Sequence, residues 1–309
     1  MQVRWNGLDR DAWDSLHRTA AAPLQQDWAY GEAMRAAGVQ CLRAQVLADT
    51  GEPLGQAQFI ARRVAWLVWN ALCTRGPVFA EPTRSQAPAK AQVYRALQRE
   101  VPLRRPRVLL FSPDEPASPA AGLDRLHRVI TGQSTVLIDL DADTATRRAA
   151  LHPKWRNRLV AAERAGLRVQ RVGARPAQYR WLIERETAQR ASRGYQALPP
   201  GFVEAYQAAR PPGDDPVLTL RVDIGREPVA AMMFLIHGTA ATYHLGWSGE
   251  QGRESGAHNL LLWQAMDQLA QRGIRLLDLG GVNTASGAGI ARFKLGSGGR
   301  VVTLAGTFL

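Results

Sequence analysis

The strongest constraint on this chain is an order of elements that occurs twice: three short apolar strands, a helix and a fourth strand. The C-terminal copy is the clearer one, because its residues alternate between apolar and polar and are divided by short turns. Its strands are expected at 216–224, 229–236, 240–247 and 274–279, and its helix at 259–271. Gly273 follows the helix at the usual stop position. Such short turns predict that the first three strands form an antiparallel meander.

The N-terminal copy is fainter but has the same order. Its strands are expected at 41–47, 56–64, 65–72 and 107–111, and its helix at 89–100. A chain of 309 residues is long enough for two domains. The repeat therefore predicts two related α+β domains, 1–140 and 141–309, with the seam near a strand at 135–140 that runs into an acidic stretch.

A basic segment follows the seam. The chain has a formal net charge of +12, and nine basic residues lie between Arg147 and Arg175 against one acid, Glu163. Part of this segment predicts a helix that begins at Pro153 and ends before Gly166. Its apolar stripe would be formed by Trp155, Leu159 and Ala162. A cluster of this charge predicts affinity for a polyanion, such as tRNA, a pyrophosphate-bearing precursor or an anionic membrane face.

Other features exclude whole classes of protein. The first residues form no apolar signal segment, and no run of about 18 apolar residues occurs. We therefore expect a cytoplasmic protein, with peripheral membrane contact as an option. Cys41 and Cys73 lack metal-ligand spacing and fit reduced, half-buried thiols. No metal site is expected.

Several segments together resemble the Fem family, the peptidyltransferases that add amino acids to peptidoglycan precursors. In the first half these segments are 26–33 and 75–78 (Arg-Gly-Pro-Val). Segment 154–166 is similar to the basic helix that opens the family's second domain, and 243–248, 261–266, 278–281 and 289–294 follow. The resemblance implies tandem GNAT-like domains, aminoacyl-tRNA as donor, a lipid-linked or nucleotide-linked muropeptide as acceptor, and no cofactor. One departure is Met34, beside Arg35, at a position where family members often carry a substrate-binding lysine.

Acyl transfer to an amine needs a deprotonated nucleophile, a stabilised oxyanion and close positioning of two substrates. Within the matched motif, Lys294 is the candidate for holding either the oxyanion or the end of the tRNA. Asp278 could act as a general base, although capping the Gly280–Gly281 turn is the favoured role. Tyr243 and Trp247, four residues apart, are expected on one face of a strand. The expected substrate-binding residues are Trp28, Arg75, Lys154, Arg156, Tyr243, Trp247, Gly281, Asn283 and Phe293.

Two alternatives remain open. A GNAT enzyme that uses acyl-CoA would bind its pyrophosphate at a helix N-terminus, and the segment 253–258 stands in that place, although its glycine pattern is imperfect because it ends in His258. A non-catalytic relative that binds RNA or a membrane surface would need only the basic cluster.

Overall fold

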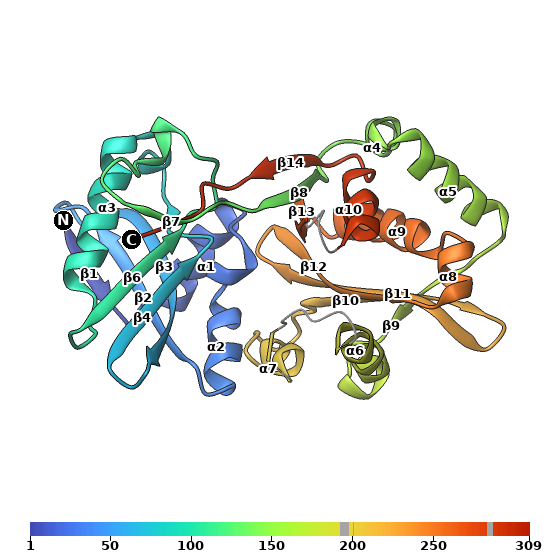
Figure 1. Cartoon of the computed structure of the whole chain (residues 1–309), viewed down its shortest axis with the longest axis horizontal. Coiled ribbons are helices and arrows are strands. Elements are labelled where there is room, and N and C mark those ends of the chain that lie inside the picture. Colours follow the sequence, from blue (N-terminus) through green and yellow to red (C-terminus); the bar gives the residue numbers. More distant parts are fainter. Residues whose placement is uncertain (192–197, 200, 283–286) are drawn as a thin grey trace. The chain divides into compact units, whose positions relative to one another are not determined.

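The computed structural model describes residues 1–191, 198–199, 201–282 and 287–309 (Figure 1). The fold is α+β and contains two compact units, each built on its own mixed sheet. Unit 1 comprises Met1–Ser134, Pro199–Arg210 and Val302–Leu309, and unit 2 comprises Thr135–Leu198 and Pro211–Val301. The predicted division at residue 140 is a single cut, whereas the chain returns twice to unit 1 and the strand at the seam belongs to the sheet of unit 2.

Unit 1 is a sheet with the strand order β1-β2-β3-β4-β6-β15-β7, and β5 pairs with β3. Its strands are β1 (Gln2–Trp5), β2 (Gln40–Leu47), β3 (Pro53–Val64), β4 (Val68–Thr74), β5 (Val78–Phe79), β6 (Arg107–Ser112), β7 (Arg128–Ile130) and β15 (Thr307–Phe308). Its helices are α1 (Arg10–Thr19), α2 (Trp28–Ala36), α3 (Ala87–Glu100) and α7 (Phe202–Ala208). The last of these comes from the C-terminal half of the sequence and packs on α2, where the Tyr30 and Phe202 rings are 5.4 Å apart.

Unit 2 has the strand order β14-β8-β13-β12-β11-β10-β9. Its strands are β8 (Ser134–Asp139), β9 (Val169–Val172), β10 (Val217–Ile224), β11 (Glu227–His237), β12 (Ala240–Ser248), β13 (Leu276–Gly281) and β14 (Arg300–Thr303). Its helices are α4 (Thr144–Ala150), α5 (Pro153–Arg164), α6 (Pro176–Ala191), α8 (Glu250–Glu254), α9 (Ala257–Gln271) and α10 (Ala288–Leu295).

The internal repeat is confirmed by strand pairing. In unit 1, β2, β3 and β4 form an antiparallel meander, and β6 returns after α3 to lie parallel to β4. In unit 2, β10, β11 and β12 form the same meander, and β13 returns after α9 to lie parallel to β12. One prediction needs correction at its edge: residues 65–67 form a turn, so β4 begins at Val68.

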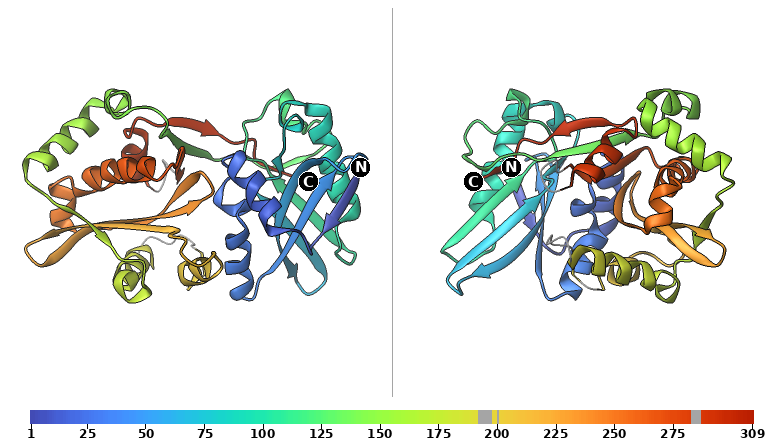
Figure 2. Two further views of the ribbon diagram at one scale, coloured as in Figure 1. Left: turned by 180° about the vertical axis from the view of Figure 1, so that it is seen from behind. Right: turned by 45° about the vertical axis from the view of Figure 1, so that its right-hand side comes forward.

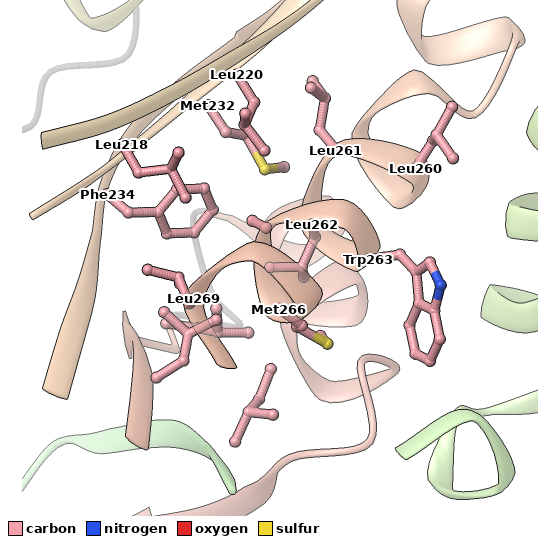
Figure 3. Packing of buried hydrophobic residues seen from close by; sticks show 14 of the residues in the cluster. Leu218, Leu220, Met232, Phe234, Leu260, Leu261, Leu262, Trp263, Met266 and Leu269 are labelled. Atoms are coloured by element: carbon pink, nitrogen blue, oxygen red, sulfur yellow. The ribbon is translucent and has the colours of Figure 1, made fainter. Parts of the chain in front are cut away.

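The core of unit 2 explains why its sequence pattern was the clearer one. Leucine and methionine side chains of α9, among them Leu262 and Met266, share one buried core with Leu218 of β10 and Phe234 of β11 (Figure 3). All four are fully buried. Helix α9 ends before Gly273, which has the positive φ of +75° expected at a helix stop.

No helix within the described part of the chain is both long and apolar enough to cross a bilayer.

Candidate active site

The candidate site lies in unit 2, at the point where β12 and β13 stop pairing. The two strands are parallel partners over three positions, from Ala240 opposite Leu276 to Thr242 opposite Asp278. Immediately beyond, β12 contains a bulge, because Tyr243 pairs with Phe234 while Leu245 pairs with Met233. A bulge bends a strand and redirects its side chains. The two strands therefore separate near the end of β13.

Lys294 lies beside this separation. It belongs to α10 and is only 8% exposed. Its Nζ donates a hydrogen bond to the carbonyl oxygen of Gly281 at 2.8 Å and lies 5.8 Å from the centre of the Tyr243 ring. Burial lowers the pKa of the Lys294 ammonium, and the nearby Asp278 carboxylate partly opposes that shift. The structure thus holds a poorly solvated cation where β13 ends.

Asp278 has the geometry of a turn cap. Its Oδ1 accepts hydrogen bonds from the Thr135 hydroxyl at 2.5 Å and from the Gly280 N–H at 2.7 Å. Gly280 has a φ of +72°, which a glycine adopts without strain. The carboxylate therefore fixes the turn that presents the Gly281 carbonyl to Lys294. Thr135, on the neighbouring strand β8, was not singled out in the sequence, since only strand pairing brings it close.

Tyr243 and Trp247 lie on opposite faces of the sheet, so the prediction of a shared face was wrong. The bulge at His244 adds one residue between them and reverses the alternation. Tyr243 faces the core with Phe234, whereas Trp247 meets Trp181 of α6 at 6.3 Å and lies under the guanidinium of Arg185. Only Tyr243 belongs to the surroundings of Lys294.

The hydroxyl end of Tyr243 lies over Gly246. A Cβ atom at position 246 would overlap the Tyr243 Oη and would come within 3.1 Å of Cζ. The missing side chain of Gly246 therefore makes room for the tyrosine ring. The sequence carried no separate signal for this role, because Gly246 simply follows His244 and Leu245 within the strand.

Phe293 packs against the rings of two neighbouring helices. Its half-buried ring contacts Trp155 of α5 and His258 of α9, each with ring centres 5.9 Å apart. It anchors α10 and so positions the neighbouring Lys294. Asn283 lies outside the described residues.

The basic helix α5 is confirmed, but the segment 147–175 carries less unpaired charge than its nine basic residues indicated. Trp155, Leu159 and Ala162 are buried as predicted. Three of the nine basic residues pair with acids: Arg147 with Asp267, Arg148 with Glu163 and Arg171 with Asp215. Lys154 and Arg158 are exposed, and Arg156 is half-buried. The remaining cations lie mainly on α5 and just after it.

The start of α9 is closely covered by α5. A Cβ atom at Gly256 would come within 2.9 Å of the Arg158 carbonyl oxygen. The Asn259 amide donates to the Trp155 carbonyl oxygen at 3.5 Å, and Ala257 is fully buried. A pyrophosphate needs open space at the first N–H groups of a helix. This packing argues against CoA binding at the position that the sequence offered for it.

Two of the expected substrate-binding residues, Trp28 and Arg75, lie in unit 1. Trp28 is packed between Trp13, 5.9 Å away, and the guanidinium of Arg43, 3.7 Å from its ring centre. Arg75 follows β4 and donates to Asp114 at 2.6 Å. It lines a cavity of about 100 Å³ together with Lys90 and Glu115, which form an ion pair at 2.7 Å.

The equivalent strands of unit 1 do not separate. β4 and β6 stay paired over six positions, from Trp69 opposite Arg107 to Thr74 opposite Ser112, without a bulge. A short 3₁₀ turn, Pro119–Ala121, is the first helical element after β6, where unit 2 has α10. Within the described residues, the separated strands and the buried lysine thus occur together in unit 2.

Comparison with known proteins agrees with this architecture. Residues 150–295 match the family model described as an acetyltransferase (GNAT) domain. The structure of FemX superposes with a TM-score of 0.82 at 14% identity, covering 100% of this chain and 96% of FemX. A tandem GNAT protein from the clavulanic acid biosynthesis pathway gives a TM-score of 0.53 at 13% identity, over 99% and 98% of the two chains. No curated protein sequence matches the chain.

The resemblance seen in the sequence is therefore confirmed in the fold, which is a Fem-like pair of GNAT-like domains.

Proposed function

Starting from this fold, an acyltransferase fold of the Fem and GNAT class, we propose that the protein transfers an aminoacyl group from aminoacyl-tRNA to an amine of a muropeptide precursor. The observation that carries the proposal is the buried ammonium of Lys294 beside the separated strands β12 and β13. A cation with little solvent around it stabilises a developing negative charge more strongly than one in water.

In the proposed reaction the free amine attacks the ester carbonyl carbon of the aminoacyl-tRNA. The carbonyl oxygen becomes an oxyanion, which the Lys294 ammonium stabilises. When the intermediate collapses, the amide C–N bond remains, the ester C–O bond breaks, and the ribose hydroxyl of the tRNA leaves with the proton that the amine loses. Asp278 keeps the Gly281 carbonyl in place, and that carbonyl holds the lysine in its position.

Two observations favour tRNA over acyl-CoA as the donor. The start of α9 is covered by α5, which leaves little space for a pyrophosphate. The exposed cations Lys154 and Arg158 on α5 suit contact with an RNA backbone. Acyl-CoA stays the alternative donor. A ligand that binds the folded protein raises its melting temperature, so charged tRNA should do so if tRNA is the donor, and a CoA ester should do so if acyl-CoA is the donor.

The test is direct incubation with a panel of charged tRNAs and lipid-linked or nucleotide-linked muropeptides, read by mass spectrometry. Lys294→Met keeps the aliphatic stem and removes the charge, so it should lower turnover at least 100-fold while tRNA affinity is retained. Arg226→Met removes a cation from an exposed position of unit 2 and should leave turnover at the wild-type level. Full turnover by Lys294→Met would refute the proposed role of the ammonium.

A further inference from the structure

The tip of the β3–β4 hairpin in unit 1 exposes large apolar side chains that the proposed reaction does not use. Trp66 is 87% exposed, Leu67 74% and Val64 50%. Isolated apolar residues on a surface need no explanation, but three side chains together at one tip indicate a contact surface.

The backbone of this turn is unfavourable for the residues it carries. The Leu67 N–H donates to the Val64 carbonyl oxygen at 3.2 Å, and the two residues between them, Ala65 and Trp66, have φ values of +49° and +61°. Hairpin turns with two positive φ values usually contain Asn and Gly, because other residues crowd their own carbonyl there. Trp66 is exposed, so burial does not offset the unfavourable backbone conformation, and tryptophan is not a residue type that favours a positive φ. Its presence is explained better by a contact outside unit 1.

Four exposed arginines lie near the tip, in two segments of the sequence that contain no acid. Arg62 and Arg63 are exposed just before the turn, and Arg104 and Arg105 are exposed just before β6. Both pairs lie at the same end of the sheet, since Trp69 is the partner of Arg63 on one side and of Arg107 on the other (Figures 1 and 2). The sequence contains no acid between residues 62 and 80 or between 101 and 113. The tip therefore combines an apolar end with four positive charges at the same end of the sheet.

We propose that this tip docks unit 1 onto an anionic lipid surface. Tryptophan prefers the interface between headgroups and acyl chains, and leucine and valine gain from leaving water there. The four arginines would lie at the level of the lipid phosphates, which they can bind through two N–H groups at once.

An RNA partner fits these observations less well. RNA would use the arginines and could stack on Trp66, but it offers little to the aliphatic ends of Leu67 and Val64. The tip also differs from α5, whose large apolar side chains Trp155 and Leu159 are buried. The proposal does not depend on which acyl group the protein transfers.

The test is cosedimentation of the full chain with vesicles of phosphatidylglycerol and phosphatidylcholine, compared with phosphatidylcholine alone. Ala65→Asn/Trp66→Gly places preferred residues in the turn, so it should melt no lower than the wild type, yet its partition onto the anionic vesicles should fall at least tenfold. Arg62→Gln/Arg63→Gln should reduce partition about fivefold per arginine. Arg226→Gln/Arg300→Gln removes the same charge from exposed positions of unit 2 and should bind as the wild type does.

Brominated lipids locate the contact. They should quench part of the tryptophan fluorescence of the wild-type protein, and Trp66→Phe should remove that quenching while most of the vesicle binding stays. Three results would overturn the proposal: unchanged partition of the Ala65→Asn/Trp66→Gly variant, equal binding to vesicles that contain only phosphatidylcholine, or a loss of tRNA affinity in the tip variants while vesicle binding persists.

Discussion

The packing of Tyr243 over Gly246 gives a prediction whose sign depends on the geometry of the site. In an ordinary strand, Gly246→Ala would stabilise the protein by about 0.4–1 kcal/mol, because it restricts the unfolded chain. Here the new methyl group would overlap the Tyr243 hydroxyl and press on the ring, where Cζ and Cε2 lie 3.1 and 3.3 Å away. Overpacking of this kind costs about 1–3 kcal/mol. We expect a net loss of about 1–2 kcal/mol in the free energy of unfolding.

A double-mutant cycle measured by urea denaturation isolates this contact. Tyr243→Phe removes the overlapping oxygen, so adding Gly246→Ala to that variant should cost about 1 kcal/mol less than adding it to the wild type. Gly289→Ala is the matched control. Apart from its chain neighbours and its own helix backbone, no atom of the described residues lies within 4 Å of its Cβ position, so the change should be stabilising. If Gly246→Ala is as stabilising as Gly289→Ala, the ring does not lie where the structure has it.

Three further outcomes follow from buried charges. Burial lowers the pKa of both His17 and His258, so the unfolded state binds more protons than the folded state below pH 6.5. The free energy of unfolding should therefore be highest above pH 6.5 and fall toward pH 5. Replacing both histidines by Gln should flatten this fall, as measured by urea titrations at each pH. Burial also lowers the pKa of Lys294, so at alkaline pH below 10.5 the unfolded state binds more protons than the folded state. As the pH rises toward 10.5, the free energy of unfolding of the wild type should therefore increase relative to that of Lys294→Met. The same pH dependence in both proteins would contradict the burial of Lys294. Arg43 is 2% exposed and donates hydrogen bonds to Glu32, Gln58 and the Trp28 carbonyl oxygen. Arg43→Met should lower the free energy of unfolding by about 3–5 kcal/mol, and a loss below about 1 kcal/mol would show that these hydrogen bonds do not stabilise unit 1.

The repeated elements of both units could be predicted because each has a local cause. Strand alternation, the stop at Gly273 and the apolar stripe of α5 are all encoded within a few neighbouring residues. The repeat followed from their order, and strand pairing confirmed it.

The site could be predicted only in part. Lys294 and Asp278 were found through a motif, and the structure brings both to the end of β13. The shared face of Tyr243 and Trp247 was predicted wrongly, because a bulge depends on the pairing of two strands and leaves no mark in the sequence of one. The count of free cations in the basic cluster was too high for a related reason, since the acids that pair with Arg147 and Arg171 come from distant segments.

By itself, the sequence determined the type and order of the elements in each half, because periodicity, turns and caps act between residues a few positions apart. Only the tertiary structure decided which half separates its central strands, which acids neutralise which arginines, and which apolar side chains remain in solvent at the β3–β4 tip. Those outcomes depend on contacts between residues far apart in the chain, and burial and electrostatics act through space rather than along the sequence.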